Sequence, residues 1–153
     1  MKVMIAILLI SVALVLDGWS ISLADDQPSV IRVHFTDLPN DIGRVGCTIF
    51  KAPGDGFPQS RDKATARING PIQDKTGLCE FKGLTAGTYA VAVFHDQKET
   101  GNMVKNFLGM PTEAYGFSND AKPSIATMSA PSFQACSFSY PGGTMDITIH
   151  AQH

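Results

Sequence analysis

The sequence has few charged residues and no dense run of one sign, which excludes several functional classes. Of 153 residues, 12 are Lys or Arg and 14 are Asp or Glu, so the formal net charge is -2. After Lys2 the basic residues are scattered singly, from Arg32 to Lys122, and form no cationic stripe that could neutralise the phosphates of a nucleic acid. We therefore expect no nucleic-acid partner.

No hydrophobic run is long enough to span a bilayer as a helix. The longest, Ile5–Leu16, has about 12 residues, whereas a span needs about 20. It follows Lys2 and precedes small residues at positions 22 and 24, the pattern of a secretory signal peptide cleaved before Asp25. We expect residues 1–24 to be removed, leaving a periplasmic or secreted chain without a membrane span. An uncleaved membrane anchor is the alternative.

Long amphipathic helices and internal repeats are also absent, whereas short runs of alternating apolar and polar residues are frequent. These runs predict strands at residues 30–38, 44–51, 64–68, 78–82, 88–95, 133–140 and 144–151. About seven short strands separated by turn residues favour a single all-β domain over residues 25–153. We expect an antiparallel β-sandwich, immunoglobulin-like in its number of strands.

The segment between residues 97 and 130 has no strong period of either kind. It is rich in Gly, Pro, Asn and Asp, and we expect a long loop with a helical turn near residues 102–108. The strand before it, residues 88–95, is apolar on both faces and is expected at the centre of a sheet. Long loops in compact domains are often functional, so we expect the sandwich to present residues 96–119 for binding.

Cysteines are few, and all three lie after the expected cleavage point. Cys47 and Cys79 both belong to predicted strands and share a face with an apolar residue, so both point towards the core. In an oxidising compartment these two are expected to form a disulfide, which leaves Cys136 as a free thiol. Three reduced core cysteines are the alternative.

The chain resembles a family of exported bacterial proteins, domain of unknown function family 2141. The segments that carry the resemblance are residues 83–96, GLTAGTYAVAVFHD, and residues 107–119, FLGMPTEAYGFSN, of which Gly-Phe-Ser-Asn is the most specific part. The resemblance covers nearly the whole mature chain. It implies a sandwich similar to transthyretin-like and carboxypeptidase-regulatory domains, and it implies no activity.

Members of that family often carry a calcium-type loop after the His-Asp pair. The resemblance places Asp96, Lys98, Thr100, Gly101 and Val104 at the positions of that loop. Calcium sites need several oxygen ligands, and here an ammonium group and an isopropyl group replace two of them. We therefore expect no metal and no cofactor, with calcium binding as the alternative.

His95 and Asp96 also suggest an acid or base at the end of a strand. No G-x-S-x-G motif or other partner for a catalytic His is visible, so a hydrolase using His95 is the weaker hypothesis. The structural alternative is that His95 bonds to the long loop and Asp96 caps the turn that opens it.

Phe107, Tyr115 and Phe117 are the loop aromatics, and Asn119 follows them. These aromatics either pin the loop onto the sandwich or form a surface for a carbohydrate or a peptide. The binding candidates are therefore His95, Asp96, Phe107, Tyr115, Phe117 and Asn119. The favoured function is a non-enzymatic binding or structural module, and the alternatives are a calcium-dependent adhesion or carbohydrate-binding module and a hydrolase.

The signal peptide gives a direct prediction. N-terminal sequencing of the exported protein should begin at Asp25, because the small residues at positions 22 and 24 suit signal peptidase. A mature chain that begins at Met1 would contradict this assignment.

Overall fold

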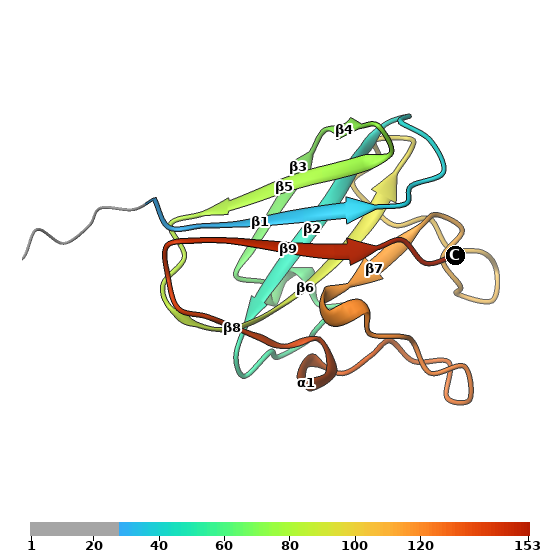
Figure 1. Ribbon diagram of the computed structural model, residues 1–153. Helices are drawn as coiled ribbons and strands as arrows, with labels where there is room; N and C mark the ends of the chain where they lie inside the picture. Colours follow the sequence, from blue (N-terminus) through green and yellow to red (C-terminus); the bar gives the residue numbers. More distant parts are fainter. Residues whose placement is uncertain (1–27) are drawn as a thin grey trace, which may run out of the picture.

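The computed structural model describes residues 28–153, which form two packed β-sheets (Figure 1). The strands are β1 (Val30–Thr36), β2 (Arg44–Lys51), β3 (Ala66–Gly70), β4 (Ile72–Gln73), β5 (Thr76–Lys82), β6 (Gly87–Asp96), β7 (Tyr115–Phe117), β8 (Phe138–Tyr140) and β9 (Thr144–His150). Between them lie two 3₁₀ turns, η1 (Arg61–Lys63) and η2 (Ser118–Asp120), and one short helix, α1 (Phe133–Cys136).

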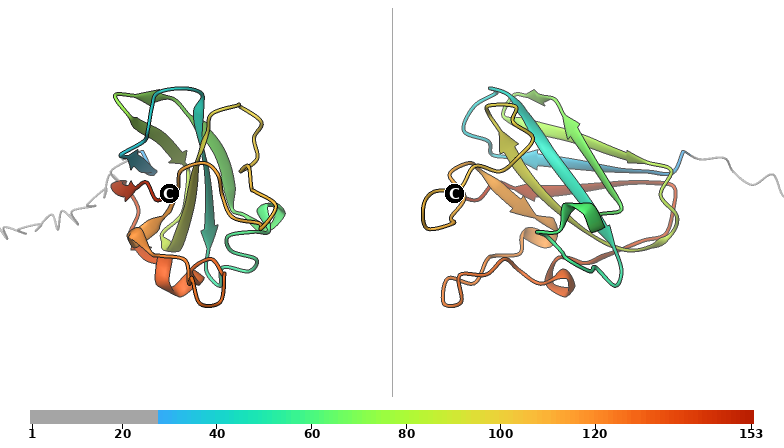
Figure 2. Two further views of the ribbon diagram at one scale, coloured as in Figure 1. Left: turned by 90° about the vertical axis from the view of Figure 1, so that its right-hand side faces the viewer. Right: turned by 180° about the vertical axis from the view of Figure 1, so that it is seen from behind.

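The two sheets confirm the expected all-β sandwich. One has the order β4-β5-β1-β9, and the other has the order β3-β2-β6-β7, with β8 also paired to β6. The two layers are seen from the end and from behind in Figure 2. The named pairs are antiparallel except β1 with β9, which run parallel. The last strand of the chain, β9, therefore lies beside the first strand, β1, at one edge of the first sheet.

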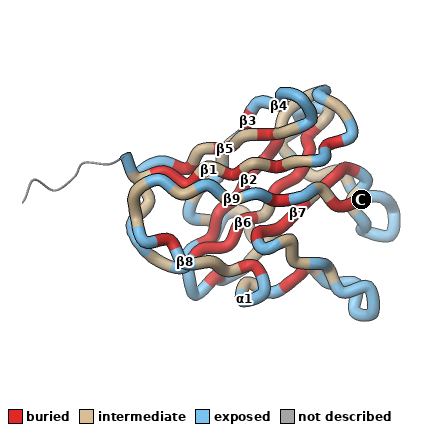
Figure 3. The backbone as a smooth tube through the Cα atoms, in the orientation of Figure 1, coloured by how far each residue is buried: buried red, intermediate tan, exposed pale blue. Residues whose placement is uncertain are grey.

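The alternation of side chains explains the core. In β1, Ile31, Val33 and Phe35 are fully buried, while Arg32 and His34 face outwards and are only half-buried. The inner face of the other sheet contributes apolar residues from β2 and β6, and these form one core cluster with the residues of β1. Figure 3 shows buried segments in strands of both sheets. This apolar contact between the two sheets is the main stabilising interaction of the fold.

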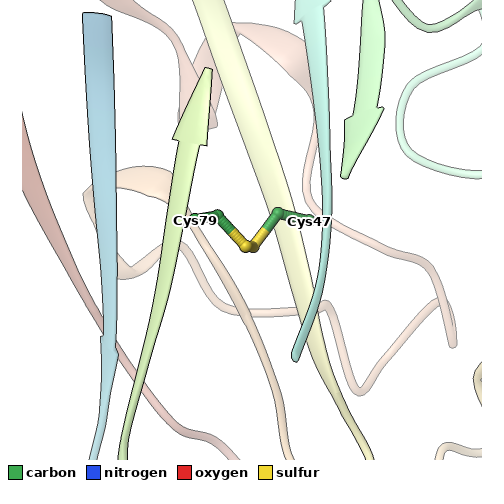
Figure 4. The surroundings of a disulfide bond; sticks show 2 residues. All are labelled: Cys47 and Cys79. Atoms are coloured by element: carbon green, nitrogen blue, oxygen red, sulfur yellow. A yellow bond between two sulfur atoms is a disulfide. The ribbon is translucent and has the colours of Figure 1, made fainter. Parts of the chain in front are cut away.

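A disulfide joins the two layers at their centre. Cys47 of β2 and Cys79 of β5 are bonded, with Cα atoms 6.5 Å apart and 32 positions apart in sequence (Figure 4). The predicted pairing is thus confirmed. Cys136 is unpaired and buried, and this burial raises the pKa of its thiol to about 11.

Three local predictions were wrong. Residues 133–140 do not form one strand, because Ser132 accepts a hydrogen bond from the Ala135 N–H at 3.2 Å and starts the short helix α1 before β8. Residues 102–108 contain no helical turn and belong instead to a hairpin closed by the Lys105–Pro111 bridge. The long loop also contains β7, which is too short to show a period.

The expected signal peptide, residues 1–24, lies outside the described residues. Among the helices of residues 28–153, none combines the length and the apolar character needed to cross a membrane.

The disulfide should contribute strongly to stability. In the chain-entropy model, a bridge across this 32-residue separation stabilises the fold by about 3–4 kcal/mol. We expect the double variant Cys47→Ala/Cys79→Ala to lose this amount in urea unfolding and to become insensitive to reductant. A Cys136→Ala control should keep the full sensitivity to reductant. Equal unfolding of the wild type with and without reductant would contradict the prediction.

Candidate functional site

The loops that carry most candidate residues leave from one end of the sandwich. Arg44 at the start of β2 is paired with Asp96 at the end of β6, so the loops 37–43 and 97–114 begin or end side by side. The segment after η2 also extends from this end, and both long loops project there in Figures 1 and 2. This end holds the candidate site.

His95 is built into the base of these loops. Its ring has no exposed surface, and Nε2 lies 2.7 Å from the carbonyl oxygen of Ile42, in the loop between β1 and β2. Since a carbonyl oxygen only accepts, Nε2 carries the proton. Nδ1 is buried without a hydrogen-bond partner among the described residues. His95 therefore holds the loop 37–43 in place. The expected hydrogen bond from its ring to the long loop is not among those of the described residues.

Asp96 caps the start of the long loop, as predicted. Its side chain is fully buried and accepts hydrogen bonds from the N–H groups of Thr100 at 2.8 Å and Gly101 at 2.7 Å, and from Arg44 Nε at 3.3 Å. Burial alone would raise the pKa of the carboxyl group. The backbone hydrogen bonds and the Arg44 guanidinium outweigh this effect and lower the pKa below its ordinary value. The carboxylate is thus a structural anchor.

The residues of the calcium-type loop do not assemble a cation site. Donors already surround both oxygens of Asp96. The next oxygen side chain after the loop position Val104 is that of Asn106, and it accepts from the N–H groups of Leu108 and Met110 in a separate turn. Within residues 28–153, no cluster of three or more His, Cys, Asp or Glu residues could hold a metal ion. The geometry therefore does not fit calcium at this loop.

The Gly-Phe-Ser-Asn segment closes a gap along one edge of β6. β7 pairs with residues 92–94 and β8 with residues 87–89, which leaves Val91 without a strand partner on that edge. The hydroxyl of Ser118 fills the gap: it accepts from the Val91 N–H at 2.9 Å and donates to the Cys136 carbonyl at 2.6 Å. Buried backbone groups must be satisfied, so Ser118 takes the place of a strand.

Its neighbours have structural roles as well. Gly116 has no space for a side chain, because a Cβ atom would lie 2.5 Å from Ile149. Asn119 has a positive φ of 63° and donates to the carbonyls of Ala135 and Ser137. Asn119, a predicted ligand residue, therefore ties the chain to the end of α1.

A cleft of about 800 Å³ lies over the outer face of the second sheet. Its floor includes Ala92 and Phe94 of β6 together with Tyr115 and Phe117 of β7. Because successive residues of a strand face opposite sides, Ala92 and Phe94 point away from the core that contains Val91 and Val93.

Two hairpins flank this floor. The first hairpin, residues 104–112, contributes Met110, and the second hairpin, residues 124–129, contributes Ile125 and Met128. Ile125 is 88% exposed, and Met110 and Met128 are also exposed. Exposed methionines offer flexible apolar contacts that adapt to a ligand.

The charged side chains that line the cleft are of one sign. Arg61, Lys105 and Lys122 line it, and no Asp or Glu is among its lining residues. The chain as a whole carries a formal charge of -2, so this surface is locally positive.

The structure divides the predicted ligand residues into three groups. Tyr115 and Phe117 line the cleft, and Phe117 is also buried against Phe57, with ring centroids 6.2 Å apart. His95, Asp96 and Asn119 hold the loops in place. Phe107 is 95% exposed at the tip of the first hairpin and does not pin the loop.

Sequence reasoning missed the second hairpin and Arg61. Both come from segments without periodicity, and Arg61 reaches the cleft only because η1 lies beside the sheet face. The sequence does hold one sign of this surface: both hairpins contain apolar residues and neither contains Asp or Glu.

The comparisons with known proteins identify a family and nothing further. Residues 33–148 match the family described as an uncharacterised protein conserved in bacteria, DUF2141. No curated protein matches the chain, and no solved structure matches it.

Ser118 gives a test of the edge-closing role. Ser118→Ala leaves the Val91 N–H and the Cys136 carbonyl buried without a partner, and should lower the free energy of unfolding by about 2–3 kcal/mol. Ser139→Ala, at an exposed position of β8, is the control and should change it by less than about 0.5 kcal/mol. Urea unfolding measures both, and equal effects would contradict the assignment.

Asp96 gives a test through pH. Its lowered pKa means that its stabilising effect is complete above the ordinary Asp value of about 3.9, and is lost as the pH falls through the lower folded value. Asp96→Asn should therefore be less stable than the wild type by roughly 1–3 kcal/mol at pH 7.

The difference between the two proteins should shrink as the pH falls below 4, because the wild-type carboxyl group becomes neutral as well. Urea unfolding from pH 7 to pH 2.5 measures this difference. Asp62→Asn, at an exposed position, is the control and should show no such trend. A difference that stays constant across the range would contradict the prediction.

Proposed function

The chain belongs to DUF2141, and since the description of that family assigns no activity, we propose from the geometry of this chain that it is a non-enzymatic binding module. Its ligand lies in the cleft between the two hairpins, with an apolar body against the sheet face. The observation that carries this proposal is the cleft of about 800 Å³, a volume within the usual range of small-molecule sites.

The construction of the cleft supports binding. Its floor is a face of a rigid sheet, whereas its walls are hairpins with exposed apolar side chains at Met110, Ile125 and Met128. A ligand that covers these side chains removes apolar surface from water, which favours association. Binding sites often combine a rigid scaffold with loops that adapt to the ligand.

The titratable groups favour binding over catalysis. His95 and Asp96 are fully buried and already hydrogen-bonded, so neither reaches a substrate in this structure. No side-chain carboxylate or thiol lines the cleft. Among the hydrogen bonds of the described residues, none joins a Ser, Thr or Cys side chain to a His, as an activated nucleophile requires. The hydrolase alternative is therefore less well supported.

We also propose that the protein works outside the cytoplasm, in the periplasm or beyond it. The signal-type pattern of residues 1–24 favours export, and the disulfide between Cys47 and Cys79 is compatible with an oxidising compartment.

A neutral fluorescent probe tests the cleft. N-phenyl-1-naphthylamine should bind saturably, with a rise in fluorescence, because it has an apolar body and no charge. Met110→Glu, which places a charge in the cleft wall, should weaken binding about fivefold or more.

Leu108→Glu is the matched control. Leu108 lies on the same hairpin and is exposed, but it is not among the lining residues, so the affinity should stay that of the wild type. If the probe fails to saturate, or if both variants bind as the wild type does, the proposed function is wrong.

A further inference from the structure

A second, smaller cavity adjoins the cleft on the same face of the sheet. It has a volume of about 250 Å³, and it shares Thr48 and Arg61 with the cleft. Arg67 and Asn69 of β3 line its other side. Arg61 therefore lines both cavities, which lie next to one another.

The small cavity contains two guanidinium groups and no acidic residue. Neither Arg61 nor Arg67 forms an ion pair with any described residue. Burial and the charge of Arg67 lower the pKa of Arg61, and the charge of Asp96 offsets part of this effect. Asp96 itself is engaged by Arg44 and by backbone N–H groups. Two like charges thus face one cavity without a counter-charge of their own.

Arg61 is held in position for recognition. Its Nη1 donates to the Asn102 side chain at 2.8 Å, and its guanidinium lies over the Phe94 ring at 5.5 Å. Gly46 makes this possible, because a Cβ atom there would lie 2.4 Å from the Phe94 ring. A guanidinium that is fixed in this way loses little entropy when it binds an anion.

We propose that the small cavity binds the anionic head group, a carboxylate or a phosphate monoester, of an amphiphile whose apolar body lies in the cleft. This inference rests on the proposed function and specifies its ligand class. Planar guanidinium groups match the oxygens of carboxylates and phosphates, and Phe94 marks the transition from the charged cavity to the apolar floor.

The geometry favours a small amphiphile over a peptide. The cleft floor is the face of β6 and β7 and not a free strand edge, since β6 is paired on both sides. An extended peptide that binds to a sheet uses the backbone groups of an open edge. The face of a sheet offers apolar side chains instead. Such a surface suits the alkyl chain or the ring of a small ligand, which has no peptide backbone to pair.

Three ligands with the same apolar body test the inference. Octyl phosphate, octanoate and octanol are titrated against the full chain by displacement of the neutral probe. The two anions should bind about tenfold more tightly than octanol, because charge-assisted hydrogen bonds to guanidinium add to the same apolar contact.

Arg67→Gln should reduce the preference for the anions about fivefold while leaving octanol and the neutral probe unchanged. Arg67 is exposed, so the variant should keep the melting temperature of the wild type. Lys63→Gln is the control: it removes the same charge two positions after Arg61 but outside both cavities, and it should keep the full preference.

The outcomes separate this inference from the proposed function. If the probe and octanol bind but the anions gain nothing, or if both variants behave alike, the head-group site is wrong and the cleft stands. If inorganic phosphate alone binds as tightly as octyl phosphate, the small cavity is a free-phosphate site and the amphiphile is wrong. If the probe itself does not bind, the proposed function fails first.

Discussion

Strand β6 has apolar side chains on both faces, and both faces must be covered. Tyr89, Val91 and Val93 face the first sheet and belong to the main core. Ala90 and Ala92 face outwards into a second apolar cluster, and that face has no sheet to cover it. A strand that is apolar on both sides is stable only when protein lies on both sides.

The outer cover is built from irregular segments. Phe57, Phe117 and Phe133 pack edge to face in this second cluster, with neighbouring ring centroids about 6 Å apart. The cleft lies beside this cover on the same face of the sheet, and Ala92 and Phe94 are among the residues that line it.

Polar groups at the same end are satisfied inside the loops. Asp96, His95 and Ser118 each supply the hydrogen bonds that irregular backbone needs near a buried strand. His95 and Asp96, which the sequence suggests as a catalytic acid or base, therefore hold the loops in place. The cleft is left to apolar side chains and to cations that form no ion pair among residues 28–153, which is why we propose it as the binding surface.

Residue patterns along the chain were enough to predict the sandwich, the central place of residues 88–95 and the cross-sheet disulfide. Each depends on alternation within a few residues of one strand, which a linear pattern records directly. The sequence also predicted Tyr115 and Phe117 as ligand residues, and the structure places both in the lining of the cleft. The tertiary structure alone decides that His95 and Asp96 are buried, because burial depends on what packs over a residue. It alone brought Arg61 beside Arg67 and the second hairpin beside the first. Those residues lie in separate segments, and their proximity arises from the folding of the sheets.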